Sequence, residues 1–184
     1  MLHQQIDFEL AEREAWALRR QQGIPNNRRL MVLSCMDERV PVEQALGIRV
    51  GDAHVFRNAG GVVTDDVIRS AMITTNFLGT KEIIVLTHTE CGSMKATADF
   101  VTSALKEKGF DPDQVQIDPS LPELKLDLGA FPKWLKAFHQ VDAAAVRQVE
   151  LLRKSPLIPD EVVIHGYVWE VENMRLRRPH EALS

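Results

Sequence analysis

Several features that mark specialised protein classes are missing from this chain of 184 residues. No apolar run approaches the ~20 residues that a helix needs to cross a bilayer. Basic residues do not predominate either, because 22 lysines and arginines face 26 acidic residues and give a net charge of −4 at pH 7. Such a balance provides no positive field to hold phosphates. We therefore expect neither nucleic acid nor a membrane as a partner.

The N-terminal sequence also lacks the pattern of a secretion signal. Residues 1–7 contain no basic stretch followed by an apolar one. We therefore expect a cytoplasmic protein, in which the two cysteines would not form a structural disulfide. A hydrophobic share of 45% is ordinary for a globular protein, and the length favours a single domain over residues 1–184.

Short apolar runs predict four strands, of which the first and third are continuous and bounded by polar residues, as expected of strands buried on both faces. They lie at residues 30–35, 53–57, 82–87 and 162–168, and helical patterns follow at 41–46, 64–78, 93–108 and 134–153. This alternation predicts an α/β fold with a mostly parallel central sheet flanked by helices. Residues 170–176 are expected to return as a hairpin. Residues 109–132 contain four prolines and no clear period, which is typical of a lid or an interface loop.

Residues 1–29 are predicted to form an N-terminal helical arm. A helix over residues 4–22 ends where glycine and proline begin at Gly23. Its apolar residues do not form one clean stripe, so apolar surface lies on more than one side. Two interpretations remain open: an arm that packs partly on another subunit, or an ordinary surface helix.

Three residues with soft metal-ligand side chains lie at the carboxyl ends of two predicted strands. Cys35 ends the first strand, while His88 and Cys91 follow the third. Carboxyl ends of parallel strands lie at one edge of a sheet, where binding sites form. Two thiolates and one imidazole favour zinc, and three protein ligands leave one position open, as in catalytic zinc sites. The alternative, that the cysteines are small buried hydrophobes, fits poorly beside so many charged residues.

Two charged residues follow Cys35 on the same turn. A zinc ion held by two thiolates and a neutral imidazole carries no net charge, so its water is less acidified than at three histidines. Asp37 could accept a proton from that water or orient it. Arg39 could hold Asp37 by a bidentate contact. The alternative is a structural ion pair that only fixes the turn.

The remaining polar candidates are weaker. His54 and His165 lie in apolar strands and are expected to be hydrogen-bonded core residues rather than ligands. The pair Gly60-Gly61 predicts tight backbone geometry, but no phosphate-loop pattern surrounds it.

Three stretches together resemble the β-carbonic anhydrase family: Cys35-x-Asp37-x-Arg39, Arg57-Asn58-Ala59-Gly60-Gly61 and His88-x-x-Cys91-Gly92. The resemblance covers nearly the whole chain. It implies one zinc ion per subunit on the two cysteines and the histidine, and a catalytic Asp37–Arg39 dyad. In this family the aspartate either pairs with the arginine or binds the zinc in place of water. The resemblance also implies a homodimer or a larger homo-oligomer with active clefts at subunit interfaces.

Within that family, the stretches 24–30, 74–77, 157–159 and 166–172 resemble the carbon disulfide hydrolases of acid-loving sulfur microbes. Those enzymes convert carbon disulfide through carbonyl sulfide to carbon dioxide and hydrogen sulfide. The resemblance implies a small neutral linear substrate whose central carbon is attacked by a zinc-activated water. One stretch departs from the subgroup, because residues 93–96 resemble ordinary carbonic anhydrases. Reversible hydration of carbon dioxide to bicarbonate is therefore the alternative activity.

Two further classes are open. A metal-binding or redox module without catalysis would use Asp37 as a permanent fourth ligand. A nucleotide-binding protein on a doubly wound sheet would rest on analogy of fold alone.

Overall fold

The computed structural model describes residues 17, 19–21, 23, 26–110, 120 and 130–180. Its centre is a five-stranded sheet in the order β2-β1-β3-β4-β5. The strands are β1 (Leu30–Cys35), β2 (Ala53–Asn58), β3 (Glu82–His88), β4 (Val163–Glu170) and β5 (Arg175–Arg177). The first four run parallel, and β5 returns antiparallel to β4. The predicted mostly parallel α/β sheet and the final hairpin are therefore confirmed.

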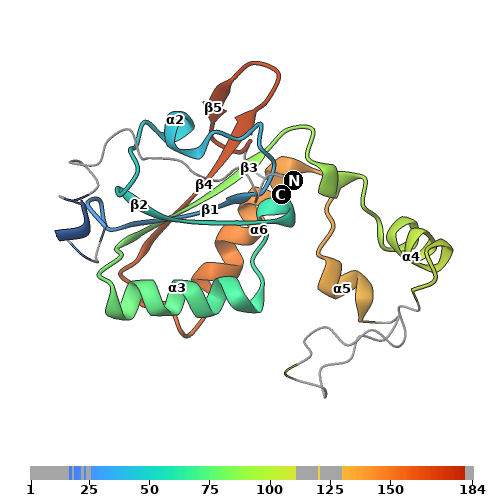
Figure 1. Ribbon diagram of the computed structural model, residues 1–184, viewed down its shortest axis with the longest axis horizontal. Helices are drawn as coiled ribbons and strands as arrows, with labels where there is room; N and C mark the ends of the chain where they lie inside the picture. Colours follow the sequence, from blue (N-terminus) through green and yellow to red (C-terminus); the bar gives the residue numbers. More distant parts are fainter. Residues whose placement is uncertain are drawn as a thin grey trace.

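Both faces of the sheet are covered, which explains why its central strands read as continuous apolar runs. Figure 1 shows α3 (Asp65–Phe77) and α6 (Val141–Arg153) on one face of the sheet and α2 (Val42–Leu46) on the other. Because side chains alternate along a strand, Met31 and Leu33 join the core beneath α3 and α6. Leu30 and Val32 join the opposite core with Val42.

The helices begin where the sequence supplies a cap. Thr64 accepts a hydrogen bond from the backbone N–H of Val67 and so begins α3, within the range predicted for this helix. The helix predicted over 93–108 begins later, as α4 (Ala98–Glu107), because Thr97 is its N-cap. The short 3₁₀ turn η3 (Gly92–Met94) precedes it.

The single helix predicted over residues 134–153 is wrong. The structure has α5 (Phe131–Leu135), then a break, then α6. Lys136 adopts a left-handed backbone conformation with φ of 53°, which ends α5. Neither glycine nor proline lies at the break, so the sequence contains no residue that would have predicted the end of a helix there.

Most of the predicted N-terminal arm and of the 109–132 loop lies outside the described residues. Within the predicted arm, residues 17 and 19–21 are helical. Among the described residues, no helix is long and apolar enough to cross a membrane.

Candidate metal and catalytic site

The structure brings the three predicted ligands together at the carboxyl edge of the sheet. Cys35 ends β1, His88 ends β3 and Cys91 lies on the turn after β3. Because β1 and β3 are neighbours, both turns emerge side by side. One ligand atom from each of the three residues lies within 4.8 Å of the others, and all three residues are buried. Such a cluster can share one metal ion.

The ring of His88 is set for metal binding. Its Nδ1 lies 2.8 Å from the backbone oxygen of Thr89, so Nδ1 carries the proton and donates it there. Its Nε2 is buried and has no hydrogen-bond partner among the described residues. A buried nitrogen without a partner is costly, and a metal ion would remove that cost.

The two thiols form a coupled pair, with their Sγ atoms 3.9 Å apart. A hydrogen bond from Cys91, with smaller contributions from His88 and the N–H groups of Asp37 and Gly60, lowers the pKa of Cys35 to about 4. The Cys35 thiolate and burial raise the pKa of Cys91 above its ordinary value. Without a metal ion the pair therefore holds one proton, and a divalent cation would take the place of that proton.

A glycine lets the chain approach Cys35 closely. Gly61 lies in the turn η2 (Ala59–Gly61) with φ of 61°, and a Cβ there would lie 2.8 Å from the backbone nitrogen of Cys35. Only glycine fits this conformation and this space without displacing the ligand turn. The predicted tight geometry at Gly60-Gly61 is confirmed.

Asp37 and Arg39 form a bidentate pair beside the ligands. Arg39 donates from Nε to Oδ1 of Asp37 at 3.0 Å and from Nη2 to Oδ2 at 2.8 Å. These hydrogen bonds lower the pKa of Asp37 to about 2, with further help from the Arg39 N–H and from His88. Oδ2 of Asp37 lies 3.8 Å from Nε2 of His88, so the carboxylate faces the ligand cluster.

Two residues make contacts with the turns after β1 and β3 that could not be predicted from the sequence. Glu90 accepts a hydrogen bond from Nη1 of Arg39 at 3.0 Å and so ties the second turn to the first. Arg57, on β2, donates from Nε to the backbone oxygen of Cys35 at 2.9 Å and also donates to that of Asp37. Each contact joins residues that are far apart in sequence, and only the sheet order brings them together.

The expectation for the two strand histidines is wrong. The side chain of His165 is 45% exposed and lies 3.7 Å from a carboxylate oxygen of Glu82, because β4 bears it on an open part of the sheet. His54 is half-buried, but its Nε2 has no hydrogen-bond partner among the described residues. Burial, with a smaller effect of Arg19, lowers the pKa of His54.

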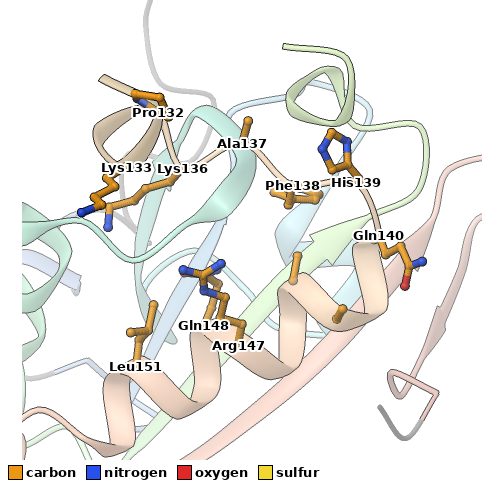
Figure 2. A pocket seen from close by; sticks show the side chains of 12 residues that line it. Pro132, Lys133, Lys136, Ala137, Phe138, His139, Gln140, Arg147, Gln148 and Leu151 are labelled. Carbon is orange, nitrogen blue, oxygen red and sulfur yellow. The ribbon is translucent and has the colours of Figure 1, made fainter. Parts of the chain in front are cut away.

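A separate pocket of about 740 Å³ lies between α5 and α6. Figure 2 shows Lys133 and Lys136 on one side of it and Arg147 of α6 on the other. None of the five predicted site residues lines this pocket. At its upper end, Phe138 approaches η2, since a Cβ on Gly60 would lie 3.3 Å from that ring.

Comparisons with known proteins agree with this geometry. A family profile described as carbonic anhydrase matches residues 30–176. A carbon disulfide hydrolase from Acidithiobacillus thiooxidans is 59% identical over 181 residues, covering 97% of this chain and 91% of the relative. The solved apo form of a carbon disulfide hydrolase is 53% identical, with a TM-score of 0.84 over 98% of this chain and 93% of that one. A carbonic anhydrase from Streptococcus mutans is 33% identical, with a TM-score of 0.69 over 94% of this chain and 100% of that one.

Proposed function

The chain belongs to the β-carbonic anhydrase family, and on that premise we propose that it is a zinc-dependent hydrolase of carbon disulfide and carbonyl sulfide. The overall reactions would be CS₂ + H₂O → COS + H₂S and COS + H₂O → CO₂ + H₂S. In each, one C–O bond forms at the central carbon, one C–S bond breaks, and the sulfur leaves with both protons of the water.

The observation that carries the proposal is the buried cluster of two thiols and one imidazole with an unpartnered Nε2. Cys35, His88 and Cys91 would hold the zinc ion, since this ligand set suits zinc and closes around one cation. When bound, zinc supplies Lewis-acid chemistry that makes a water molecule nucleophilic at neutral pH.

Asp37 and Arg39 would be the catalytic pair. A carboxylate with a pKa of about 2 is a poor proton acceptor at neutral pH, because general bases work best with a pKa near the working pH. Asp37 therefore orients the attacking water by accepting a hydrogen bond, and does not carry the proton away. Arg39 keeps the carboxylate ionised and fixed in direction through its two donors.

The preference for sulfur substrates rests on similarity along the whole chain to proteins named carbon disulfide hydrolase. One stretch favours a second candidate, carbonic anhydrase activity. Residues 93–96, which follow Cys91 directly after Gly92, resemble ordinary carbonic anhydrases. A less apolar wall beside Cys91 would admit carbon dioxide and bicarbonate more readily.

A paired assay separates the two activities. The zinc-loaded protein is incubated with carbon disulfide while hydrogen sulfide and carbonyl sulfide are measured, and hydration of carbon dioxide is followed by stopped flow. We expect sulfide release with transient carbonyl sulfide, and none with a His88→Ala control. Fast proton release from carbon dioxide without any sulfide would overturn the sulfur preference and favour the second candidate.

We also propose a homo-oligomer. Phe77, Phe100 and Phe110 are each more than half exposed, and such apolar surface is typical of subunit contacts. Light scattering after size exclusion tests this, and a monomer at micromolar concentration would contradict it. The single domain over residues 1–184 and the cytoplasmic location stay predictions.

A further inference from the structure

Trp169, near the end of β4, touches both ligand-bearing turns. Its backbone oxygen accepts a hydrogen bond from the N–H of Thr89 at 2.9 Å, and Thr89 lies on the turn between His88 and Cys91. Its indole Nε1–H donates to the backbone oxygen of Arg39 at 3.1 Å, on the turn after Cys35. Trp169 is 7% exposed. One rigid residue thus links the two turns.

The second of these links crosses the sheet. In the strand order, β3 lies between β1 and β4, and His88 is the register partner of Trp169. Neighbouring strands are about 4.8 Å apart, so β1 and β4 are about 10 Å apart and cannot share backbone hydrogen bonds. The indole spans this interval past the end of β3. Trp169 belongs to the same buried apolar cluster as Val40, the residue directly after the carbonyl that the indole holds.

The backbone link continues to the His88 ring. The N–H of Thr89 is held by Trp169, and the carbonyl of the same Thr89 accepts the Nδ1–H of His88. The Thr89 hydroxyl in turn accepts from the N–H of Val171. Thr89, whose carbonyl fixes the tautomer and direction of His88, is therefore held through its N–H by Trp169 in β4 and through its hydroxyl by Val171, directly after β4.

We propose that Trp169 is a positioning residue that sets the separation of the Cys35 turn and the His88–Cys91 turn, and thereby the affinity of the three ligands for their metal ion. This inference rests on the metal site of the proposed function but not on the choice of substrate. Because the ligands come from separate turns, a looser Cys35 turn raises the cost of gathering them around one ion. Residues that orient metal ligands from outside typically change metal affinity by about 10–100-fold.

Trp169 could instead only support the core, because a buried indole N–H usually finds some acceptor. The variants below separate this role from the positioning of the metal ligands. The sharpest variant replaces Trp169 with benzothienylalanine, which keeps the bicyclic shape but has sulfur in place of the N–H. Trp169→Phe is a second variant, in which the donor is lost together with part of the ring. Trp134→Phe is the control, since Trp134 lies on α5, is 49% exposed and stacks on Phe131.

Two measurements are made on full-length protein. Zinc affinity is measured by competition with a chromophoric chelator, and amide hydrogen exchange is measured on the metal-free protein. For benzothienylalanine at position 169 we expect a loss of about 10–100-fold in zinc affinity, an unchanged melting temperature within a few degrees, and faster exchange at residues 38–40. Trp169→Phe should show the same losses, and the Trp134→Phe control none.

Wild-type zinc affinity and unchanged exchange in the benzothienylalanine protein would overturn the proposal. A uniform rise in exchange over the whole sheet would also overturn it, because Trp169 would then support only the core. If the wild-type protein bound no zinc, the proposed function would fail, whereas exchange at residues 38–40 would still test the link.

Discussion

The predicted ligands and the predicted dyad lie on the same two turns but in different surroundings. Cys35, His88 and Cys91 are 5%, 1% and 2% exposed. The side chain of Asp37, by contrast, is 16% exposed and that of Arg39 41%. One turn, from Cys35 to Arg39, passes from one environment to the other within five residues.

The difference in burial assigns different physical tasks to the two groups. Buried thiols and an unpartnered imidazole nitrogen raise the free energy of the folded protein when no cation is bound. Binding of a metal ion removes this cost, so the main task of these three residues is to hold the ion. A partly exposed ion pair contributes little to folding, since solvent screens it. Its position, however, lets a carboxylate meet both water and the ligand cluster. Variants of the two groups should therefore fail in different ways.

The largest effect is expected for His88→Ala. It removes the buried nitrogen that has no other partner, so we expect loss of stoichiometric zinc and at least about a 1,000-fold loss of turnover. Zinc is measured by elemental analysis of the dialysed protein, beside sulfide release. Full zinc occupancy in this variant would exclude His88 as a ligand and remove the contrast between the two groups.

The next effect is expected for Asp37→Asn, which keeps the size of the side chain and removes its charge. Because Asp37 is not among the proposed ligands, zinc content should stay at the wild-type level. Turnover should fall by about 100-fold, because a neutral amide orients the attacking water less firmly than a carboxylate, and misplacement of a reacting group costs on this scale. Cobalt substitution gives a spectroscopic check on the site. Loss of metal in Asp37→Asn would mean that the carboxylate itself holds the ion.

Arg39→Lys should have a smaller effect, of about tenfold on turnover, because lysine keeps the charge but cannot form the bidentate contact. The pKa of Asp37 gives a sharper test. Arg39 lowers this pKa to about 2, so the ionised carboxylate persists until pH falls through that value. Lysine should let the pKa rise toward its ordinary 3.8, and an NMR titration of the Asp37 carboxyl carbon in the metal-free protein measures this change. An unchanged pKa of Asp37 in Arg39→Lys would contradict the assignment.

Much of this comparison was predictable, because it follows from where the strands end. The runs at 30–35 and 82–87 are continuous and apolar, and in a parallel sheet their carboxyl ends must meet at one edge. Cys35, His88 and Cys91 could thus be grouped from spacing alone. The bidentate contact of Asp37 with Arg39 follows from two residues of separation on one turn.

The parts that could not be predicted depend on order across the sheet. The contacts of Arg57 and Trp169 with the first turn need the order β2-β1-β3-β4, which no local pattern encodes. The break between α5 and α6 depends on Lys136 in a left-handed conformation, and lysine carries no preference for it. The prediction that His165 is a core residue was wrong because apolar neighbours along a strand do not show whether a helix covers that position.

The smallest effect on activity is expected at an ion-pair network away from both groups. Arg177 of β5 donates from Nη2 to Asp142 of α6 at 3.1 Å and from Nε to Glu170 of β4 at 2.8 Å. It is better buried than the dyad, since its side chains are 17% to 25% exposed whereas that of Arg39 is 41% exposed, and it bears no ligand. Asp142→Asn should therefore leave turnover unchanged and lower the free energy of unfolding at neutral pH by about 2 kcal/mol, the scale of a hydrogen bond to a charged group.

The pH dependence of that stability has a definite sign. Arg177, with the N–H of His180, lowers the pKa of Asp142 in the folded state. The unfolded chain therefore takes up the proton first as pH falls, and the stabilisation present above the ordinary pKa of 3.8 is lost as pH drops toward the folded value. Denaturant titrations of wild type and Asp142→Asn should differ at pH 7 and converge in acid. A constant difference at all pH values would show that packing and not charge holds α6 to β5, and an accompanying loss of turnover would show that the ligand turns depend on this distant network.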